Sequence, residues 1–222
     1  MNSFALPDFT IHNNIPLDLI SRKRDEWIDK DNRLRLLPAS EYLSQPPIVI
    51  QAVGNFTARY VFPTVELIDW LRQRIGTRRA LEIGAGQGDL GRLLGIPMVD
   101  NFCQQRPEVK AYYAAFHQVP TFPPVEVERM DAVEAVKKYR PQVVIGAFIT
   151  HKFRGGAAGN EHGPVEEDII ANCETYIHIG NDVTHKAKAI LGLPHESHCF
   201  DWLVTRAKNP SQNVIWIWNN GA

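Results

Sequence analysis

The sequence has little of several features that mark particular classes of protein. Its 222 residues include only three cysteines. These cysteines are far apart and odd in number, so no disulfide framework is predicted and a reducing cytoplasm is the expected compartment. No apolar run reaches the roughly 18 residues that a membrane span requires. The N-terminus also lacks the basic and apolar regions of a secretory signal. We therefore expect a cytoplasmic protein that makes no contact with a membrane.

An excess of charge of either sign is also missing. The chain has 24 Lys and Arg residues and 25 Asp and Glu residues, which leaves a formal net charge of −1. A dedicated nucleic-acid binder gains its affinity from many uncompensated basic side chains. The balance of charge therefore predicts a small-molecule partner rather than nucleic acid, although it is compatible with a local basic patch.

Apolar runs and amphipathic segments alternate along most of the chain. Helices are predicted at residues 16–37, 63–76, 107–116, 132–139 and 165–172. Strands are predicted at residues 79–83, 97–100, 125–130, 142–149 and 175–180, and two more at 200–207 and 213–219 are predicted to form a terminal hairpin. Strands that alternate with helices predict an α/β protein with a parallel sheet covered by helices on both faces.

The most informative segment is LEIGAGQGDLG, residues 81–91. A predicted strand leads into a loop with glycine at every second position, Gly84, Gly86 and Gly88, and then into a helix. Glycine permits positive φ angles and lets a ligand lie against bare backbone. The helix N-terminus adds unpaired N–H groups. This arrangement predicts a ligand site at the end of the first strand.

Two classes of ligand use such a loop. Gly86, Gly88 and Gly91 match the G-x-G-x-x-G spacing of dinucleotide sites. However, the carboxylate of Glu82 would face and repel a pyrophosphate. In addition, Asp100 follows Gly86 by only 14 residues, whereas a ribose-binding acid is expected after about 20. A zwitterionic ligand without phosphates fits better, because its ammonium group is attracted to Glu82 and its carboxylate can accept from loop N–H groups.

The segment EIGAGQG, residues 82–88, resembles motif I of the class I S-adenosylmethionine-dependent methyltransferases. Asp100 after the second predicted strand and Asp131 after the third follow the order of acids in that family. The resemblance covers about residues 60–220. It implies a doubly wound, seven-stranded, mostly parallel sheet with an antiparallel C-terminal strand, which is the Rossmann-like methyltransferase fold. We therefore predict a cofactor-binding domain at residues 61–222 and an N-terminal helical cap at residues 1–60.

The same resemblance implies S-adenosylmethionine as the cofactor. Asp100 matches the residue that hydrogen-bonds the ribose hydroxyls, and Asp131 matches the one that meets the adenine amino group. The end of the fourth strand matches the place that delivers residues nearest the methyl group. The predicted cofactor-binding residues are Tyr60, Glu82, Gly84, Ala85, Gly86, Gly88, Asp100, Asn101, Asp131, Ala132, Phe148 and Thr150.

The three acids can also be explained without a ligand, as side chains that only stabilise the local backbone. Glu82 can cap the loop that follows it, and Asp100 or Asp131 can cap the next helix. Any one acid alone is compatible with either role, but the three together favour a ligand.

His151 is the predicted general base. Imidazole accepts protons near neutral pH, and His151 ends a central strand, where ligands bind in open α/β sheets. No metal is predicted, because His195, His198 and Cys199 are joined by no second pair of ligands at suitable spacing.

The predicted function is transfer of a methyl group from S-adenosylmethionine to an acceptor, expected to be a small molecule. Two alternatives stay open: an NAD-dependent oxidoreductase, and a non-catalytic module that binds the cofactor without turnover. The fourth strand is not followed by an Asn/Asp-Pro-Pro-Tyr tetrad, and no Pro-Cys pair is present. These absences argue against methylation of exocyclic amines or of cytosine C5 in DNA.

Overall fold

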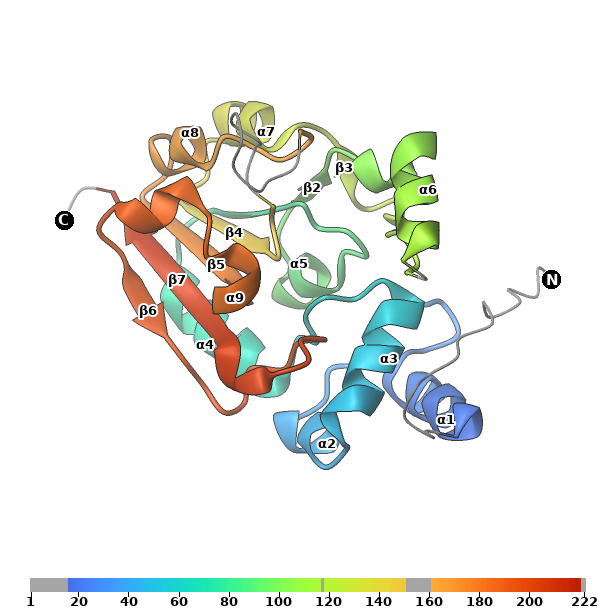
Figure 1. The fold of residues 1–222 in the computed structure, drawn as a ribbon. Helices are drawn as coiled ribbons and strands as arrows, with labels where there is room; N and C mark the ends of the chain where they lie inside the picture. The colour runs from blue at the N-terminus through green and yellow to red at the C-terminus, as the bar shows by residue number, and fades with distance from the viewer. Residues whose placement is uncertain (1–15, 117, 151–160, 221–222) are drawn as a thin grey trace.

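The computed structural model describes residues 16–116, 118–150 and 161–220. Its strands are β1 (Ala80–Ile83), β2 (Met98–Asp100), β3 (Glu128–Arg129), β4 (Val143–Ala147), β5 (Thr175–Asn181), β6 (Glu196–His198) and β7 (Asn213–Asn219). They form one sheet in the order β3-β2-β1-β4-β5-β7-β6 (Figure 1). Strands β1 to β5 pair in parallel, whereas β7 is antiparallel to both β5 and β6. The predicted fold class is confirmed, since this is the strand order of the Rossmann-like methyltransferase fold.

Helices cover both faces of the sheet (Figure 1). They are α1 (Leu17–Trp27), α2 (Ala39–Leu43), α3 (Pro47–Thr57), α4 (Val65–Ile75), α5 (Asp89–Leu94), α6 (Pro107–Ala115), α7 (Ala132–Tyr139), α8 (Glu166–Ile170) and α9 (Asp182–His185), with short 3₁₀ turns at Cys103–Gln105, Ala189–Gly192 and Pro210–Gln212. No helix within the described residues has the length and apolarity needed to cross a membrane.

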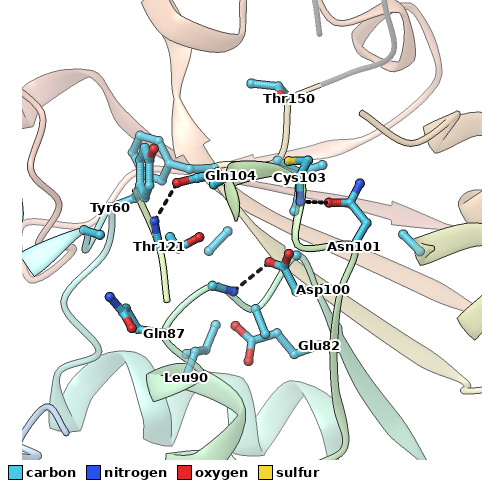
Figure 2. Close-up of a pocket in the computed structure, with 18 of the residues that line it drawn as sticks. Tyr60, Glu82, Gln87, Leu90, Asp100, Asn101, Cys103, Gln104, Thr121 and Thr150 are labelled. Carbon is cyan, nitrogen blue, oxygen red and sulfur yellow. Dashed lines mark hydrogen bonds between the residues drawn. The ribbon is translucent and has the colours of Figure 1, made fainter. Parts of the chain in front are cut away.

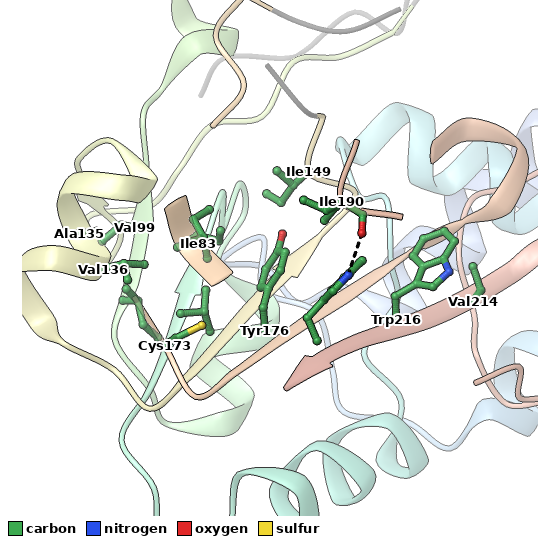
Figure 3. Close-up of a cluster of buried hydrophobic side chains, with 14 residues drawn as sticks. Ile83, Val99, Ala135, Val136, Ile149, Cys173, Tyr176, Ile190, Val214 and Trp216 are labelled. Carbon is green, nitrogen blue, oxygen red and sulfur yellow. Dashed lines mark hydrogen bonds between the residues drawn. The ribbon is translucent and has the colours of Figure 1, made fainter. Parts of the chain in front are cut away.

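Two apolar cores form because the central strands bury side chains on both faces. On one face, α7 and α8 pack against the sheet around Tyr176 and Trp218 (Figure 3). The indole N–H of Trp218 donates to the Ile190 carbonyl at 2.9 Å, so this polar group is satisfied inside the core. On the other face, α4 and α5 cover Ile145 and Ile177. The carboxyl ends of the parallel strands β1 to β5 lie at one edge of this sheet.

Helices α1, α2 and α3 build a third apolar cluster beside the sheet. Its centre is an aromatic group in which the Trp27 ring lies 4.8 Å from that of Tyr42 and 5.8 Å from that of Phe62. Val204, from the chain segment before β7, also belongs to this cluster. The division of the chain at residue 60 stays a prediction.

A buried ion pair joins this helical region to the loop after β1. The Nε atom of Arg59 lies 2.8 Å from Oδ2 of Asp89, and the two side chains are 2% and 8% exposed. The other carboxylate oxygen of Asp89 accepts from the backbone N–H of Leu34 at 2.8 Å. The guanidinium also donates to the carbonyl of Asn32 at 2.6 Å. The first turn of α5 is therefore fixed from the N-terminal side.

Two predicted elements differ from the structure. The helix predicted over residues 16–37 ends at Trp27, because the Asp29 side chain accepts from the backbone N–H groups of Asp31 and Arg33, each at 2.9 Å, and turns the chain there. The prediction of a strand at residues 200–207 is also wrong, and the partner of β7 is β6 instead.

Side-chain packing explains why residues 200–202 do not form the predicted strand of the C-terminal hairpin. The rings of Phe200 and Trp202 stack at 4.2 Å, and both lie against Trp70 of α4, at 5.5 and 6.4 Å. Burying these rings beside the helix holds residues 200–202 out of the sheet. Sequence alternation does not distinguish the two outcomes, because aromatic side chains favour strands and core packing alike.

Candidate active site

A pocket opens at the carboxyl ends of β1, β2 and β4, where ligands bind in open α/β sheets (Figure 2). The space among its lining residues is about 1020 Å³ when the part open to solvent is included. Its wall comprises the loop after β1, the ends of β2 and β4, the segment around Thr121, and residues 162–164. The Gly-rich loop predicted as a ligand site therefore lines a pocket at the carboxyl end of the sheet.

The loop after β1 needs glycine for two separate reasons. Gly84 and Gly86 have φ angles of +59° and +54°, which L-residues with side chains rarely adopt. A Cβ atom on Gly84 would overlap Cδ1 of the buried Ile149, and one on Gly86 would lie 3.1 Å from Cγ2 of Thr121. Gly88, also a predicted cofactor-binding residue, is the N-cap residue before α5 and does not line the pocket; its φ of +72° turns the chain into the helix.

Gly84→Ala is expected to lower the free energy of unfolding more than Gly95→Ala does, by about 1–3 kcal/mol. Both positions have positive φ, but a Cβ on Gly95 meets nothing within 4 Å, whereas one on Gly84 overlaps Ile149. Gly95→Ala therefore isolates the backbone strain. Urea unfolding of the two variants measures the difference, and equal losses would show that Ile149 moves aside without penalty.

Glu82, in β1, brings a carboxyl group to the floor of the pocket. The residue is only 3% exposed, and its Oε2 accepts from the backbone N–H of Gly91 at 2.7 Å. Burial raises the pKa of Glu82 to about 8, with smaller contributions from the nearby carboxylates of Asp89 and Asp100 and despite the lowering effect of the Gly91 hydrogen bond. A cation that enters the pocket would therefore favour the ionised form of Glu82, and the proton would be released to solvent.

Asp100, at the end of β2, connects that strand to the Gly-rich loop. Its Oδ2 accepts from the backbone N–H of Gly86 at 2.9 Å, and its Oδ1 accepts from that of Phe102 at 2.7 Å (Figure 2). Burial raises the pKa of Asp100, while both hydrogen bonds lower it. One acid therefore sets the shape of the loop and presents charge to the pocket.

Asp131 and Asn101 form the far end of the pocket. Asp131 caps α7, because its Oδ1 accepts from the backbone N–H groups of Val133 and Glu134 at 2.8 and 3.3 Å. The capping role considered for it is therefore present, and the side chain lines the pocket as well. The amide of Asn101 donates to the carbonyl of His162 at 2.8 Å, which ties residues 162–164 to the end of β2.

Tyrosine and phenylalanine side chains form the opposite end. The ring of Tyr60 lies 5.7 Å from that of Phe148, and the Tyr60 hydroxyl is 2.7 Å from the hydroxyl of Tyr113. Burial raises the pKa of Tyr113, so this hydroxyl stays protonated. Phe148 has a φ angle of +53°, a strained value of the kind that clusters at functional sites. Its backbone N–H donates to the Ile179 carbonyl at 2.8 Å, which holds it there.

Acidic side chains outnumber basic ones in the pocket. Glu82, Asp89, Asp100 and Asp131 line it, and the lone Lys or Arg side chain among the described lining residues is Arg59, which already pairs with Asp89. A polyphosphate would meet uncompensated carboxylates here. A ligand that carries positive charge is favoured instead.

Most of the predicted residues converge on this pocket. They are Tyr60, Glu82, Gly84, Ala85, Gly86, Asp100, Asn101, Asp131, Ala132, Phe148 and Thr150. His151, the predicted general base, lies outside the described residues. Within the described ranges, no three His, Cys, Asp or Glu side chains are grouped so as to hold a metal ion.

The sequence did not indicate several lining residues, above all Thr121 and Gln104. The side-chain oxygen of Gln104 accepts from the backbone N–H of Thr121 at 2.8 Å, which holds the loop around Thr121 against Gly86 (Figure 2). Residues 118–124 have no regular secondary structure and no periodicity. Their place over the pocket comes from contacts across the fold, for which the sequence offers no local signal.

Comparison with known proteins gives only distant similarity. No protein-family model and no curated protein matches the sequence. Among solved structures, an rRNA methylase from Streptococcus thermophilus is 11% identical over 68% of this chain and 93% of its own, with a TM-score of 0.39. A putative RNA methyltransferase from Pyrococcus horikoshii is 13% identical over 68% and 79%, with a TM-score of 0.35. A putative SAM-dependent methyltransferase from Streptococcus mutans is 10% identical over 67% and 46%, with a TM-score of 0.34.

These findings correct the prediction about partners. Nucleic acid was ruled against on charge, yet two of the similar structures are named as RNA-modifying proteins. The prediction is therefore wrong, and the small-molecule acceptor that accompanied it has no support. The physical reason is that net charge sums over the whole molecule and says nothing of how charge is distributed around one pocket.

Proposed function

We propose that this chain binds S-adenosylmethionine in the pocket at the ends of β1, β2 and β4, and transfers its methyl group to an acceptor. The observation that carries the proposal is the meeting of the buried Glu82 and the half-buried Asp100 beside a glycine loop. Among the described residues that line this pocket, no Lys or Arg is unpaired. S-adenosylmethionine has a sulfonium and an ammonium group and no phosphate. Its positive charge therefore complements the acidic side chains of the pocket, and it can lie against the exposed backbone of the glycine loop.

Each part of the pocket has a place in this proposal. Asp100 would accept from the ribose hydroxyls, and Asp131 with the backbone of Ala132 would meet the adenine, as the family resemblance implies. Glu82 would attract the ammonium end from beneath the loop. Gly84 and Gly86 fit the role because their missing Cβ atoms keep the loop close to Ile149 and Thr121.

When bound, this cofactor supplies an activated methyl group: an electron pair of the acceptor bonds to the methyl carbon, the carbon–sulfur pair returns to sulfur, and any proton on the acceptor leaves. The protein's contribution is mainly alignment. Phe148 and Tyr60 form a fixed aromatic wall at the end of the pocket next to Thr150, where an acceptor would enter. His151 stays the predicted base for an acceptor that carries a proton.

A panel of three ligands tests the proposal. In equilibrium dialysis with radiolabelled ligands, the protein is expected to bind S-adenosylmethionine and S-adenosylhomocysteine with micromolar affinity and to bind NADH at least 100-fold more weakly. The charge of the pocket is the reason, since NADH brings a pyrophosphate to Glu82 and Asp100. Preference for NADH, or no binding of the two sulfur ligands, would contradict the proposal and would favour the oxidoreductase.

Cofactor binding alone does not distinguish an enzyme from a non-catalytic module that binds the same cofactor. A radiolabelled methyl group distinguishes the two, because an enzyme moves the label from the cofactor to an acceptor in a cell extract. A module that binds the cofactor leaves the label on it. We expect the label to move.

A further inference from the structure

Helix α6 presents an apolar surface with no partner among the described residues. It has no buried residue, although most of its side chains are apolar. Tyr112 is 63% exposed and Phe116 is 59% exposed, and their rings lie 4.8 Å apart. Phe122, beyond the helix, is 46% exposed. We call these three side chains, together with Tyr113, the aromatic tract. Exposed rings in a continuous group are unusual on a soluble surface and mark a binding site.

The aromatic tract is continuous with the pocket. Tyr112 lies 6.2 Å from Tyr113, ring to ring, and the hydroxyl of Tyr113 meets that of Tyr60 at 2.7 Å. Tyr60 in turn lies 5.7 Å from Phe148, at the end of the pocket where an acceptor would enter. A chain of rings therefore leads from the exposed helix to the reacting end of the site.

Basic side chains accompany these rings. The ammonium of Lys110 lies 5.8 Å from the ring centre of Phe122, and the guanidinium of Arg206 lies 3.5 Å from that of Tyr60. Arg129 is 5.8 Å from the ring of Phe102, next to the end of β2. Within the described ranges, no carboxylate lies within salt-bridge distance of Lys110, Arg129 or Arg206. The charges of Lys110 and Arg129, both exposed, are therefore available to an anion. The half-buried Arg206 contributes its positive charge from behind the Tyr60 ring and also donates to Oε1 of Gln118 at 3.4 Å.

We propose that the aromatic tract binds single-stranded nucleic acid and that the acceptor of the pocket is one of its bases. The inference rests on the proposed function, since it names the substrate of the same site. Flat rings stack on bases of any sequence, and interleaved cations neutralise the phosphates, which is the combination that single strands require. An apolar peptide would fit the rings but would leave the three cations without partners. A duplex keeps its bases stacked and cannot offer one to the pocket unless it is opened.

Fluorescence anisotropy of labelled 12-nucleotide probes tests this binding. The probes are a mixed-sequence RNA, the DNA of the same sequence and the RNA duplex, each at 50 and 200 mM KCl. We expect both single strands to bind, and the duplex to bind at least tenfold more weakly. The ratio between RNA and DNA shows whether the 2′-hydroxyl contributes.

Variants of the tract identify the surface. Tyr112→Ala/Phe116→Ala is expected to weaken single-strand binding about 10- to 100-fold, because each stacked base is worth ~1–3 kcal/mol. Tyr112→Leu/Phe116→Leu keeps apolar area without a ring and is expected to bind almost as weakly. The matched control is Leu43→Ala on α2, which removes another exposed apolar side chain and should change nothing. Lys110→Gln/Arg129→Gln should reduce the slope of log affinity against log salt by roughly 0.7 per residue.

Binding of S-adenosylhomocysteine by every variant separates the two proposals. If the wild type binds S-adenosylhomocysteine but none of the single strands, the inference is overturned and the proposed function stands. If the leucine variant binds single strands as tightly as the wild type, the rings do not stack on bases and the inference also fails. Sedimentation velocity supplies the third outcome: a wild-type dimer that the alanine variant converts to a monomer, with nucleic-acid affinity unchanged, would assign the tract to a second copy of this chain.

Discussion

Glu82→Gln is expected to stabilise the folded protein while it weakens binding of S-adenosylmethionine. Burial raises the pKa of this carboxyl group to about 8 in the fold, from its ordinary value of 4.5. Between these two values the folded state holds a proton that the unfolded state has lost, so stability falls as pH rises through this window. Glutamine cannot ionise, and its carbonyl oxygen can still accept from the Gly91 N–H. The variant therefore escapes a loss on the order of 3–5 kcal/mol at pH 9 and gains little at pH 5.

Urea unfolding at pH 5, 7 and 9 measures this difference. The two proteins should have similar free energies of unfolding at pH 5 and diverge as pH rises. Glu41→Gln is the matched control, because it removes the charge of an exposed glutamate on α2 and should follow the wild type at every pH. Parallel pH profiles for wild type and Glu82→Gln would mean that burial does not perturb this carboxyl group.

The same substitution should change how the cofactor binds. A cation that enters the pocket favours ionised Glu82, so binding near pH 7 should release a proton from the wild type. Calorimetry in two buffers with different ionisation enthalpies counts that proton. Glu82→Gln is expected to release none from this position and to bind S-adenosylmethionine at least tenfold more weakly. A stable variant that keeps full affinity would remove Glu82 from the site.

Asp100→Ala is expected to weaken binding of S-adenosylhomocysteine about 100-fold or more, which is roughly 3 kcal/mol. The substitution removes the acceptor for the ribose hydroxyls. It also leaves the backbone N–H groups of Gly86 and Phe102 without their acceptor, so the loop loses its shape. A hydrogen bond to a charged group contributes about 1.5–3 kcal/mol, and at least two such bonds depend on this carboxylate.

Calorimetric titration compares three variants with the wild type. Asp168→Ala, an exposed acid on α8, is the control and should bind normally. Asp100→Asn retains one carbonyl acceptor, so its affinity for S-adenosylhomocysteine should lie between those of the wild type and Asp100→Ala. Normal affinity in Asp100→Ala would refute the assignment of this residue to the ribose.

Much of the fold could be predicted because its signals are local. The continuous apolar run of β4 and the strand–glycine–helix pattern after β1 depend on neighbours in the sequence, and these elements form as predicted. The acids at positions 82, 100 and 131 could be predicted as well, because each lies at or just beyond the carboxyl end of a strand. Parallel strands carry such residues to one edge of the sheet, so their convergence needs no knowledge of packing.

The rest depends on contacts between distant residues. A hydrogen bond with Gln104 holds Thr121 at the pocket. Residues 200–202 lie outside the sheet because Phe200 and Trp202 pack against Trp70. Neither contact could be predicted from a pattern of neighbouring residues in the sequence. The partner prediction failed for a related reason, since the net charge of −1 conceals how cations and rings lie side by side around α6.

Hydrogen–deuterium exchange with and without S-adenosylhomocysteine tests the central claim most directly, because it locates the ligand on the chain. Bound ligand should slow exchange in peptides that cover residues 84–91 and 100–105, where the loop N–H groups and the end of β2 line the pocket. Peptides that cover residues 193–200, around the edge strand β6, should exchange as before. Protection confined to that second region, or no protection at saturating ligand, would contradict the account.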